Sequence, residues 1–342
     1  MTKITFKPKQ VTKRLLSELP TRARAILVGR FGLGKDAKKL TLEIIGQKYD
    51  ITRERVRQIE NYALGTIRKS DTFKKEQVTF DDLESVVDSL GGIVPEAELL
   101  NEIASDKGTQ NHVYFFLVLG DAFNREREND EFTHHWHIDK DLADSIHTSL
   151  RNLYKNLEDN ELVLESDLID TFLKEVKDLN QKYKNDEIIR RWLALSKTIG
   201  KNPLGEWGRS SSPNVRAKGM RDYAYLTIKR HGSPMHFSEV AKSISSLFNR
   251  KAHIATCHNE LIKDARFVLV GRGLYALAEW GYSSGVVKDV IVDVVRANGP
   301  LTRDEIIDKV KNERYVKDNT IVVNLQDSSL FKRHKDGTYS LA

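Results

Sequence analysis

Apolar residues recur at helical spacing through the segment that follows Thr52. They fall at intervals of three and four, which predicts a long amphipathic helix. The positions predicted to be buried on this helix are Val56, Ile59, Ala63 and Ile67. Thr52 is a typical N-cap residue, and a shorter helix capped by Thr41 is expected just before it. Two helices joined by a short turn predict a helix-turn-helix within residues 1–70.

The rest of the chain repeats a second pattern, in which a turn and an apolar residue precede a short acidic amphipathic helix. The pattern occurs at residues 91–103, 160–173, 232–244 and 299–310. A further helix follows each copy, and then a pair of short strands around a turn. The clearest pairs are expected at 267–280 and 330–342, and weaker ones at 131–138 and 203–211.

Three helices followed by a β-hairpin are the plan of a winged helix. We therefore predict a mainly α chain, in which the N-terminal helix-turn-helix is followed by tandem winged-helix units with short β-hairpin wings. The predicted units are residues 75–140, which are acidic, 141–212, 215–282 and 285–342.

Charge is distributed unevenly along the 342 residues. Residues 1–70 carry 17 Lys/Arg against 6 Asp/Glu, a net charge of +11. Residues 71–200 carry 15 against 28, a net charge of −13, and residues 201–342 carry 23 against 15, a net charge of +8. Basic segments suit phosphate contact and acidic ones are repelled by it, so the two ends are the parts of the chain suited to contact with DNA phosphates. The acidic middle is expected to avoid DNA and to face a protein.

Several classes of protein are excluded by the composition. The single cysteine, Cys257, allows no internal disulfide. No apolar run approaches the ~20 residues that cross a bilayer, and the opening MTKITFKPKQ has no apolar segment of a signal peptide. We expect a cytoplasmic, nucleoid-associated protein without membrane contact.

The first turns of the helix after Thr52 carry the side chains best suited to DNA. Arg53, Glu54, Arg57 and Gln58 share one face at the position where a recognition helix meets base edges. Arg can bond guanine, Gln adenine, and Glu can accept from cytosine. Thr52 and Arg55 suit phosphate contacts. The alternative is an exposed, ion-paired helix face with no ligand.

The segments LPTRARAILVGRFGL and TLEIIGQKYDITRERVRQIENYAL resemble region 4 of the primary sigma factors of bacterial RNA polymerase. The run TRERVRQIE carries the resemblance most strongly, and the similarity covers about residues 11–69. It implies that Arg53, Glu54, Arg57 and Gln58 face bases, that Thr52 and Arg55 contact the backbone, and that RNA polymerase is a partner. Ile44 departs from the family pattern, which has an acidic residue there. Nothing in the chain resembles the promoter-melting region 2, so a full sigma role is not expected.

Residues 223–280, from YAYLTIKRHGSPMHFSEVAKSI to FVLVGRGLYALAEW, resemble the HARE-type winged helix of the RNA polymerase delta subunit and of restriction and chromatin proteins. The resemblance implies contact with DNA or polymerase. Candidate phosphate contacts here and on the last hairpin are Lys263, Arg266, Arg272, Lys332, Arg333 and Lys335. The alternative is that the glycines only make the turn and the arginines are solvated.

Three other patterns predict no site. Gly29 to Lys35 has the spacing of a phosphate-binding loop, but it follows a helix and Asp36 replaces the required Ser or Thr. His134, His135 and His137 lack a second Cys or His pair at zinc spacing, so no metal is predicted. Cys257 beside His258 is interpreted as an ordinary thiol. We expect no catalytic residue, no cofactor and no small-molecule substrate, hence no enzyme.

Three hypotheses on function follow. The first is a DNA-binding transcription regulator or accessory factor of RNA polymerase, which binds double-stranded DNA. The second is a DNA-recognition subunit of a restriction, defence or other DNA-processing system, with catalysis supplied by a partner. The third is a non-specific architectural protein of the nucleoid.

Overall fold

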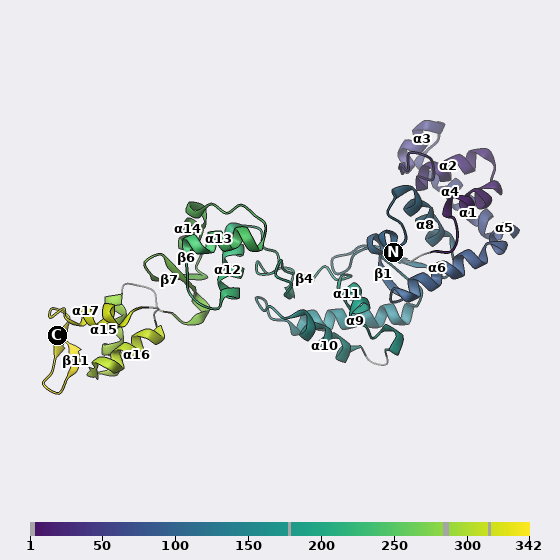
Figure 1. Cartoon of the computed structure of the whole chain (residues 1–342). Helices are drawn as coiled ribbons and strands as arrows, with labels where there is room; N and C mark the ends of the chain where they lie inside the picture. Colours follow the sequence, from purple (N-terminus) through teal and green to yellow (C-terminus); the bar gives the residue numbers. More distant parts are fainter. Residues whose placement is uncertain (1–3, 177–178, 283–286, 314–315) are drawn as a thin grey trace. The chain divides into compact units, whose positions relative to one another are not determined.

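The computed structural model describes residues 4–176, 179–282, 287–313 and 316–342 (Figure 1). The chain divides into two compact units, Met1–Gly200 and Lys201–Ala342. It is mainly helical with small antiparallel sheets, which confirms the predicted fold class. No helix within these described ranges is long and apolar enough to span a membrane.

The first unit begins with five helices. They are α1 (Pro8–Ser17), α2 (Thr21–Phe31), α3 (Leu42–Tyr49), α4 (Arg53–Lys69) and α5 (Asp71–Lys75). Pro8 opens α1 at the position where its missing N–H costs nothing. Gly32 ends α2 in the left-handed conformation with φ of 66°, which favours glycine.

Next come three helices and three short strands. They are α6 (Gln77–Ser89), β1 (Ile93–Pro95), α7 (Glu96–Ile103), α8 (Lys107–Leu119), β2 (Asn124–Glu126) and β3 (His135–His137). The strands form one antiparallel sheet in the order β1-β3-β2. Trp136 in the central strand is buried and its indole donates to Glu96 on α7.

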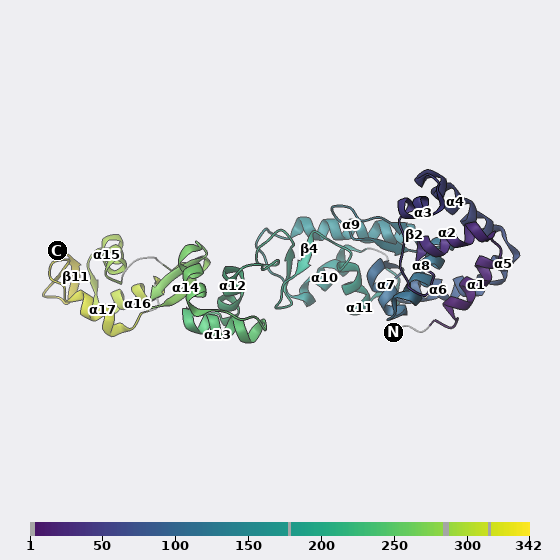
Figure 2. The same ribbon diagram turned by 90° about the horizontal axis from the view of Figure 1, so that it is seen from above.

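A single hydrophobic core joins α1, α2, α4 and α5 to α6, α7 and α8. Leu15, Leu27 and Ile67 belong to the same buried cluster as Val113 and Phe116 of α8. Helix α8 contacts both α1 and α2, and Figures 1 and 2 show it next to these two helices. The predicted segments 1–70 and 75–140 therefore share their core.

Polar contacts fasten the same two segments together. The Asn111 side chain on α8 donates to the carbonyl oxygens of Gly32 and Ala37 at 3.0 and 2.8 Å. Arg68 at the end of α4 donates to the carbonyl oxygen of Leu119 at 3.0 Å. The loop that precedes α3 is thus held by a helix more than 70 residues away in the sequence.

Four helical segments follow, and then a strand that begins in the first unit and ends at Lys201, the first residue of the second. They are α9 (Lys140–Asn156), α10 (Glu165–Glu175), the 3-10 helix η1 (Gln181–Tyr183), α11 (Asp186–Leu193) and β4 (Ile199–Lys201). Trp192 of α11 is fully buried and donates to the Gly91 carbonyl oxygen at 3.1 Å. Between the first two helices of this stretch lies a single β-bridge residue, Val163, where the other predicted winged-helix segments have a strand of two or three residues.

The second unit contains the same succession of elements twice. The first copy, preceded by β5 (Trp207–Arg209), is α12 (Met220–His231), β6 (Met235–His236), α13 (Phe237–Leu247), α14 (Ile254–Lys263), β7 (Phe267–Gly271) and β8 (Leu274–Leu277), followed by the 3-10 helix η2 (Ala278–Trp280). The second copy is α15 (Val287–Asn298), β9 (Leu301–Thr302), α16 (Arg303–Glu313), α17 (Asp318–Leu325), β10 (Phe331–Arg333) and β11 (Thr338–Leu341).

Three segments of the chain therefore share one order of elements, helix-strand-helix-helix-strand-strand. In each sheet the last strand lies between the other two, as β1-β3-β2, β6-β8-β7 and β9-β11-β10. Residues 285 and 286, where the last predicted domain begins, lie outside the described residues. The division into five domains stays a prediction.

Candidate nucleic-acid interface

Helices α3 and α4 form a helix-turn-helix whose turn is fixed by local sequence. The Thr41 hydroxyl accepts from the Ile44 amide at 3.2 Å, and the Thr52 hydroxyl accepts from the Arg55 amide at 3.1 Å. Both threonines are therefore N-caps, as predicted. Asp50 ends α3 with φ of 51°, a conformation that Asp tolerates better than most residues.

Gly46 allows the chain to pass close to α3 on its way into α4. A Cβ at this position would lie 2.6 Å from the carbonyl oxygen of Ile51, closer than van der Waals contact permits. The Ile51 amide in turn donates to the Gly46 carbonyl oxygen at 3.0 Å. The angle between α3 and α4 thus depends on the absence of a side chain at residue 46.

The apolar face of α4 packs inward, as its spacing predicted. Val56 is fully buried in a small core with Ile26 and Ile45, while Ala63 and Ile67 are fully buried farther along the helix. Ile59 is only half-buried and contacts the same small core. The beginning of α4 is thereby held against α2 and α3.

The opposite face of α4 is exposed and carries two polar pairs. The Arg57 Nε and Nη2 atoms donate to the two carboxylate oxygens of Glu54 at 2.9 and 2.7 Å. This hydrogen bonding lowers the pKa of the Glu54 carboxyl. Arg55 donates to the Gln58 side chain at 3.0 Å, whereas Arg53 is exposed at the helix start. All four predicted base-facing side chains lie on the surface.

The paired guanidinium of Arg57 keeps a free edge. A guanidinium carries five N–H donors, and Glu54 occupies those of the Nε/Nη2 edge. The Nη1/Nη2 edge remains, and it has the two parallel donors that guanine O6 and N7 accept. The ion pair therefore fixes the direction of Arg57 without exhausting its capacity.

Known proteins resemble the segment that contains this helix-turn-helix. Residues 15–69 match the family model of Sigma-70, region 4. Residues 15–69 are a sigma-70 region 4 domain. Such a domain binds DNA and is not catalytic. Its bounds enclose α2, α3 and α4.

The similar proteins are named as sigma factors. The chain is 44% identical over 59 residues to RNA polymerase sigma factor RpoD of Neisseria gonorrhoeae, which covers 17% of the chain and 9% of that protein. It is 40% identical over 74 residues to the RNA polymerase sigma-C factor of a Nostoc species, 22% of the chain and 17% of that protein. With sigma factor SigA of Clostridium acetobutylicum it shares 40% over 67 residues, 20% of the chain and 18% of that protein. The chain thus spans less than a fifth of the length of these relatives.

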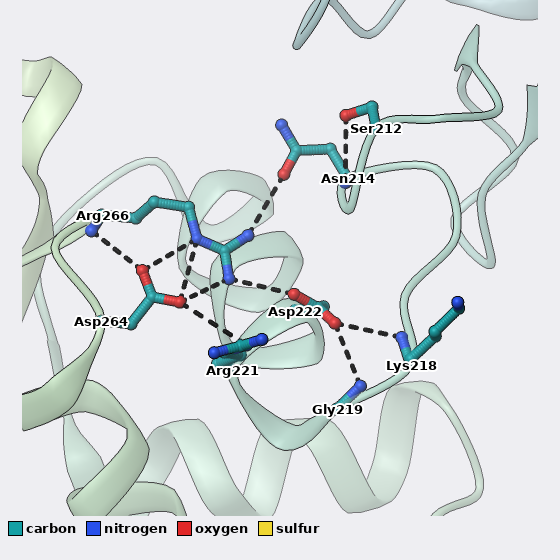
Figure 3. Close-up of polar contacts among 8 residues, drawn as sticks. All are labelled: Ser212, Asn214, Lys218, Gly219, Arg221, Asp222, Asp264 and Arg266. Atoms are coloured by element: carbon teal, nitrogen blue, oxygen red, sulfur yellow. Dashed lines mark hydrogen bonds and ion pairs between the residues drawn. The ribbon is translucent and has the colours of Figure 1, made fainter.

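In the second unit, Arg266 lies inside a network of ion pairs (Figure 3). Its guanidinium donates to Asp222 at 3.0 Å and to Asp264 at 2.7 Å, and it points toward Asn214. These hydrogen bonds lower the pKa of the Asp264 carboxyl. Arg266 was predicted as a phosphate contact from its position before the hairpin. In the structure its guanidinium is instead bound by two carboxylates of the same fold.

A groove of about 790 Å³ lies beside this network, and its rim is basic. Arg216, Lys218 and Arg221 line it with exposed side chains. The sequence pattern missed these residues because Arg216 and Lys218 lie in the irregular stretch before α12, where no periodicity indicates which side chains come together. Arg221 lies in the first turn of α12.

The other basic candidates are exposed. Lys263 is the last residue of α14, and Arg272 occupies the turn between β7 and β8. On the last hairpin, Lys332 and Arg333 lie on β10 and Lys335 follows in the turn. Each is placed where a phosphate could approach it, and their contacts with DNA stay predictions.

The patterns without a predicted site have structural explanations. Gly29 lies within α2, so the phosphate-loop spacing spans a helix end and a turn and does not follow a strand. Cys257 is fully buried, which raises the pKa of its thiol to about 11. Such a thiol is unreactive at neutral pH.

Proposed function

We propose that this chain is a DNA-binding transcription regulator or accessory factor that acts with a bacterial-type RNA polymerase and has no catalytic role of its own. One observation carries the proposal. A sigma-70 region 4 domain presents Arg53, Glu54, Arg57 and Gln58 on the exposed first turns of α4. A helix of this kind enters the major groove with its N-terminal residues at the base edges.

In this proposal Arg57 is the principal base contact. Glu54 holds the guanidinium so that its outer edge faces a guanine, and Gln58 and Arg53 contact neighbouring bases. Thr52 and Arg55 lie at the N-terminus of α4, where the helix dipole and free amides favour a phosphate.

We interpret the three segments with a common element order, and residues 141–212 more loosely, as winged helices. The segment 215–282 is the one that resembles HARE-type modules. Its hairpin turn and the last hairpin carry Arg272, Lys332, Arg333 and Lys335, which extend from the fold as phosphate contacts do. These residues add affinity for DNA or for polymerase, whereas residues 1–70 determine which DNA sequence is preferred.

The acidic segment suits a protein partner. Residues 71–200 have a net charge of −13, which a DNA backbone repels. The proteins similar to residues 15–69 are named RNA polymerase sigma factors, which favours polymerase as the partner.

Selection from random DNA duplexes tests the assigned helix face. Arg57→Ala should weaken binding to the preferred site about 5- to 150-fold and relax the base preference at one position. Lys69→Ala is the matched control, because it removes the same charge from the same helix about 18 Å farther along. An Arg57→Ala protein that selects the unchanged motif would contradict the proposal.

Footprinting and co-purification separate the competing functions. A discrete footprint at promoters, with polymerase subunits recovered alongside the endogenous protein, is the expected result. Uniform coating of DNA would favour a nucleoid architectural protein. Recovery of a nuclease or methyltransferase without polymerase would favour a restriction or other DNA-processing system.

A further inference from the structure

Three potential ligand side chains converge in the first unit, on elements other than α4. They are Glu126 on β2, His135 on β3 and His147 on α9, and their ligand atoms all lie within 4.8 Å of one another. Glu126 faces His135 directly across the antiparallel pair β2–β3. Helix α9 brings in His147, which residue spacing did not connect with the other two.

The two imidazoles face each other through the same kind of atom. His135 Nε2 lies 3.1 Å from His147 Nε2 and 3.7 Å from a Glu126 carboxylate oxygen. Tetrahedral Zn²⁺ with bonds of about 2.0–2.1 Å places its ligand atoms about 3.3 Å apart. The observed separations lie on either side of that value, so small side-chain rotations suffice to accommodate an ion.

The tautomer of His135 is the one that a metal ligand needs. Its Nδ1 lies 2.7 Å from the carbonyl oxygen of Thr133. A carbonyl oxygen only accepts, so Nδ1 carries the hydrogen and Nε2 presents a lone pair toward His147. Histidines that bind metal ions regularly make this outer hydrogen bond to a backbone carbonyl.

Both imidazole rings are buried. The side chain of His135 is 1% exposed, and His147 is buried against Phe132, whose ring stacks on it at 4.3 Å. Of the three side chains, Glu126 is the one substantially open to solvent.

A fourth residue supports the carboxylate. His137 is buried on the same face of β3 as His135, and its Nε2 lies 3.6 Å from the second oxygen of Glu126. Its Nδ1 is buried and makes no hydrogen bond within the described residues. His137 is thus a positioning residue for Glu126.

We propose that Glu126, His135 and His147 bind one divalent transition-metal cation, Zn²⁺ foremost. Two imidazole nitrogens and one carboxylate oxygen match the preferences of Zn²⁺ for nitrogen and borderline ligands. Glu126 is 38% exposed, so water reaches the fourth position from its side. The ion ties hairpin β2–β3 to α9 and stabilises the folded chain, since the unfolded chain has no assembled site.

The test uses the full-length protein after removal of metal with a chelator. Calorimetric titration with Zn²⁺ should show one ion per chain with micromolar or tighter affinity, and the ion should raise the Tm by several degrees. Co²⁺ should give the visible absorption bands of a four-coordinate site with imidazole ligands. Absence of stoichiometric Zn²⁺ binding would overturn the proposal.

Variants locate the ion. Glu126→Gln and His147→Gln should each weaken Zn²⁺ binding at least 100-fold, and His137→Gln about 10-fold. In each variant the introduced glutamine can still form hydrogen bonds. Circular dichroism of the metal-free variants checks that the variant proteins fold. The matched control is His134→Gln, because His134 is exposed and lies near Glu128 instead. If either Glu126→Gln or His147→Gln binds Zn²⁺ as the parent does, the ion lies elsewhere and the site is wrong.

Discussion

At the scale of single residues, the contact between Glu54 and Arg57 has a measurable consequence. Since Glu54 orients Arg57, either alanine variant should remove much of the same interaction with DNA. The loss of affinity in the double variant should therefore be smaller than the product of the two single losses, by more than about twofold.

The measurement is the affinity for one DNA duplex. It is made on four proteins, which are the parent, Glu54→Ala, Arg57→Ala and the double variant. Arg53→Ala combined with Glu54→Ala is the comparison, because within the described part of α4 Glu54 hydrogen-bonds to Arg57 and not to Arg53. Independent, multiplicative effects of Glu54 and Arg57 would mean that the ion pair does not survive on DNA.

Two arginines of the second unit should behave in opposite ways. Arg266→Ala leaves the buried Asp222 and the largely buried Asp264 without their shared partner, and should lower the free energy of unfolding by about 3 kcal/mol. Arg272→Ala removes an exposed side chain, and should change that free energy by less than about 0.5 kcal/mol.

Urea unfolding and DNA titration at several salt concentrations measure both effects. Arg272→Ala should lower the slope of log affinity against log salt by about 0.9, because one phosphate contact is lost. A destabilised Arg272→Ala with an unchanged slope would assign that residue to the fold.

Residue roles were predictable from the sequence where the interaction is local. The Thr52 cap involves a backbone amide three residues later, and the sequence contains both partners within one turn. Arg266 is different, because its partner Asp222 is 44 residues away and only the folded chain brings them together. For the same reason, the sequence pattern did not indicate that His147 lies beside His135.

At the scale of elements, the turn between α3 and α4 depends on one glycine. Gly46→Ala would push Cβ against the Ile51 carbonyl oxygen, a backbone atom that cannot move independently. We expect a loss of about 1–3 kcal/mol of stability and a misplaced α4. DNA affinity should fall with it.

Gly65→Ala is the matched control on α4. Nothing lies within 4 Å of a Cβ built at Gly65, and alanine favours helix by about 0.5–1 kcal/mol over glycine. Thermal unfolding should thus show opposite shifts for the two variants. Equal stability of Gly46→Ala and the parent would show that the turn relaxes easily.

The existence of helices was easier to predict than their partners. Val56 and its neighbours at helical spacing indicate which face of α4 is buried, because the period of a helix is a local property. The same residues do not indicate that α8 helps to cover this domain. The hairpins at 267–280 and 330–342 were recognisable through turns and aromatic residues. Strands β2 and β4 lie outside the predicted pairs at 131–138 and 203–211, and the order β1-β3-β2 follows from pairing over 40 residues or more.

At the scale of the whole molecule, the proposed division of labour predicts the effect of a truncation. Deleting residues 215–342 removes a region with basic hairpins but retains the compact unit Met1–Gly200. DNA affinity should fall and its dependence on salt should become weaker, since phosphate contacts are lost. The preferred sequence should not change.

Site selection and salt titration on the truncated and full chains measure these two properties. A changed preferred sequence would make the winged helices the base-contacting elements. Unchanged affinity and salt dependence would make the second unit a protein-docking module.

The charge pattern indicated different roles for the ends and the middle, but it contains no information on which segments fold together. The net charge changes sign near residue 70, which suggests a boundary between domains. The apolar residues that cross this point, such as Ile67 and Val113, lie in one core instead. Charge is set by composition, whereas the core depends on contacts between distant residues.

That shared core couples the energetics of DNA recognition to the acidic segment. If α1, α2 and α4 cannot separate from α8 without opening a common interior, the amides of α8 should exchange with solvent only when the domain around α4 also opens. A DNA duplex at 100 times its Kd would then slow hydrogen exchange in α8 by about 100-fold, although α8 is not part of the proposed DNA interface. A protein that binds the acidic segment would, by the same reciprocity, tighten the hold of α4 on its DNA.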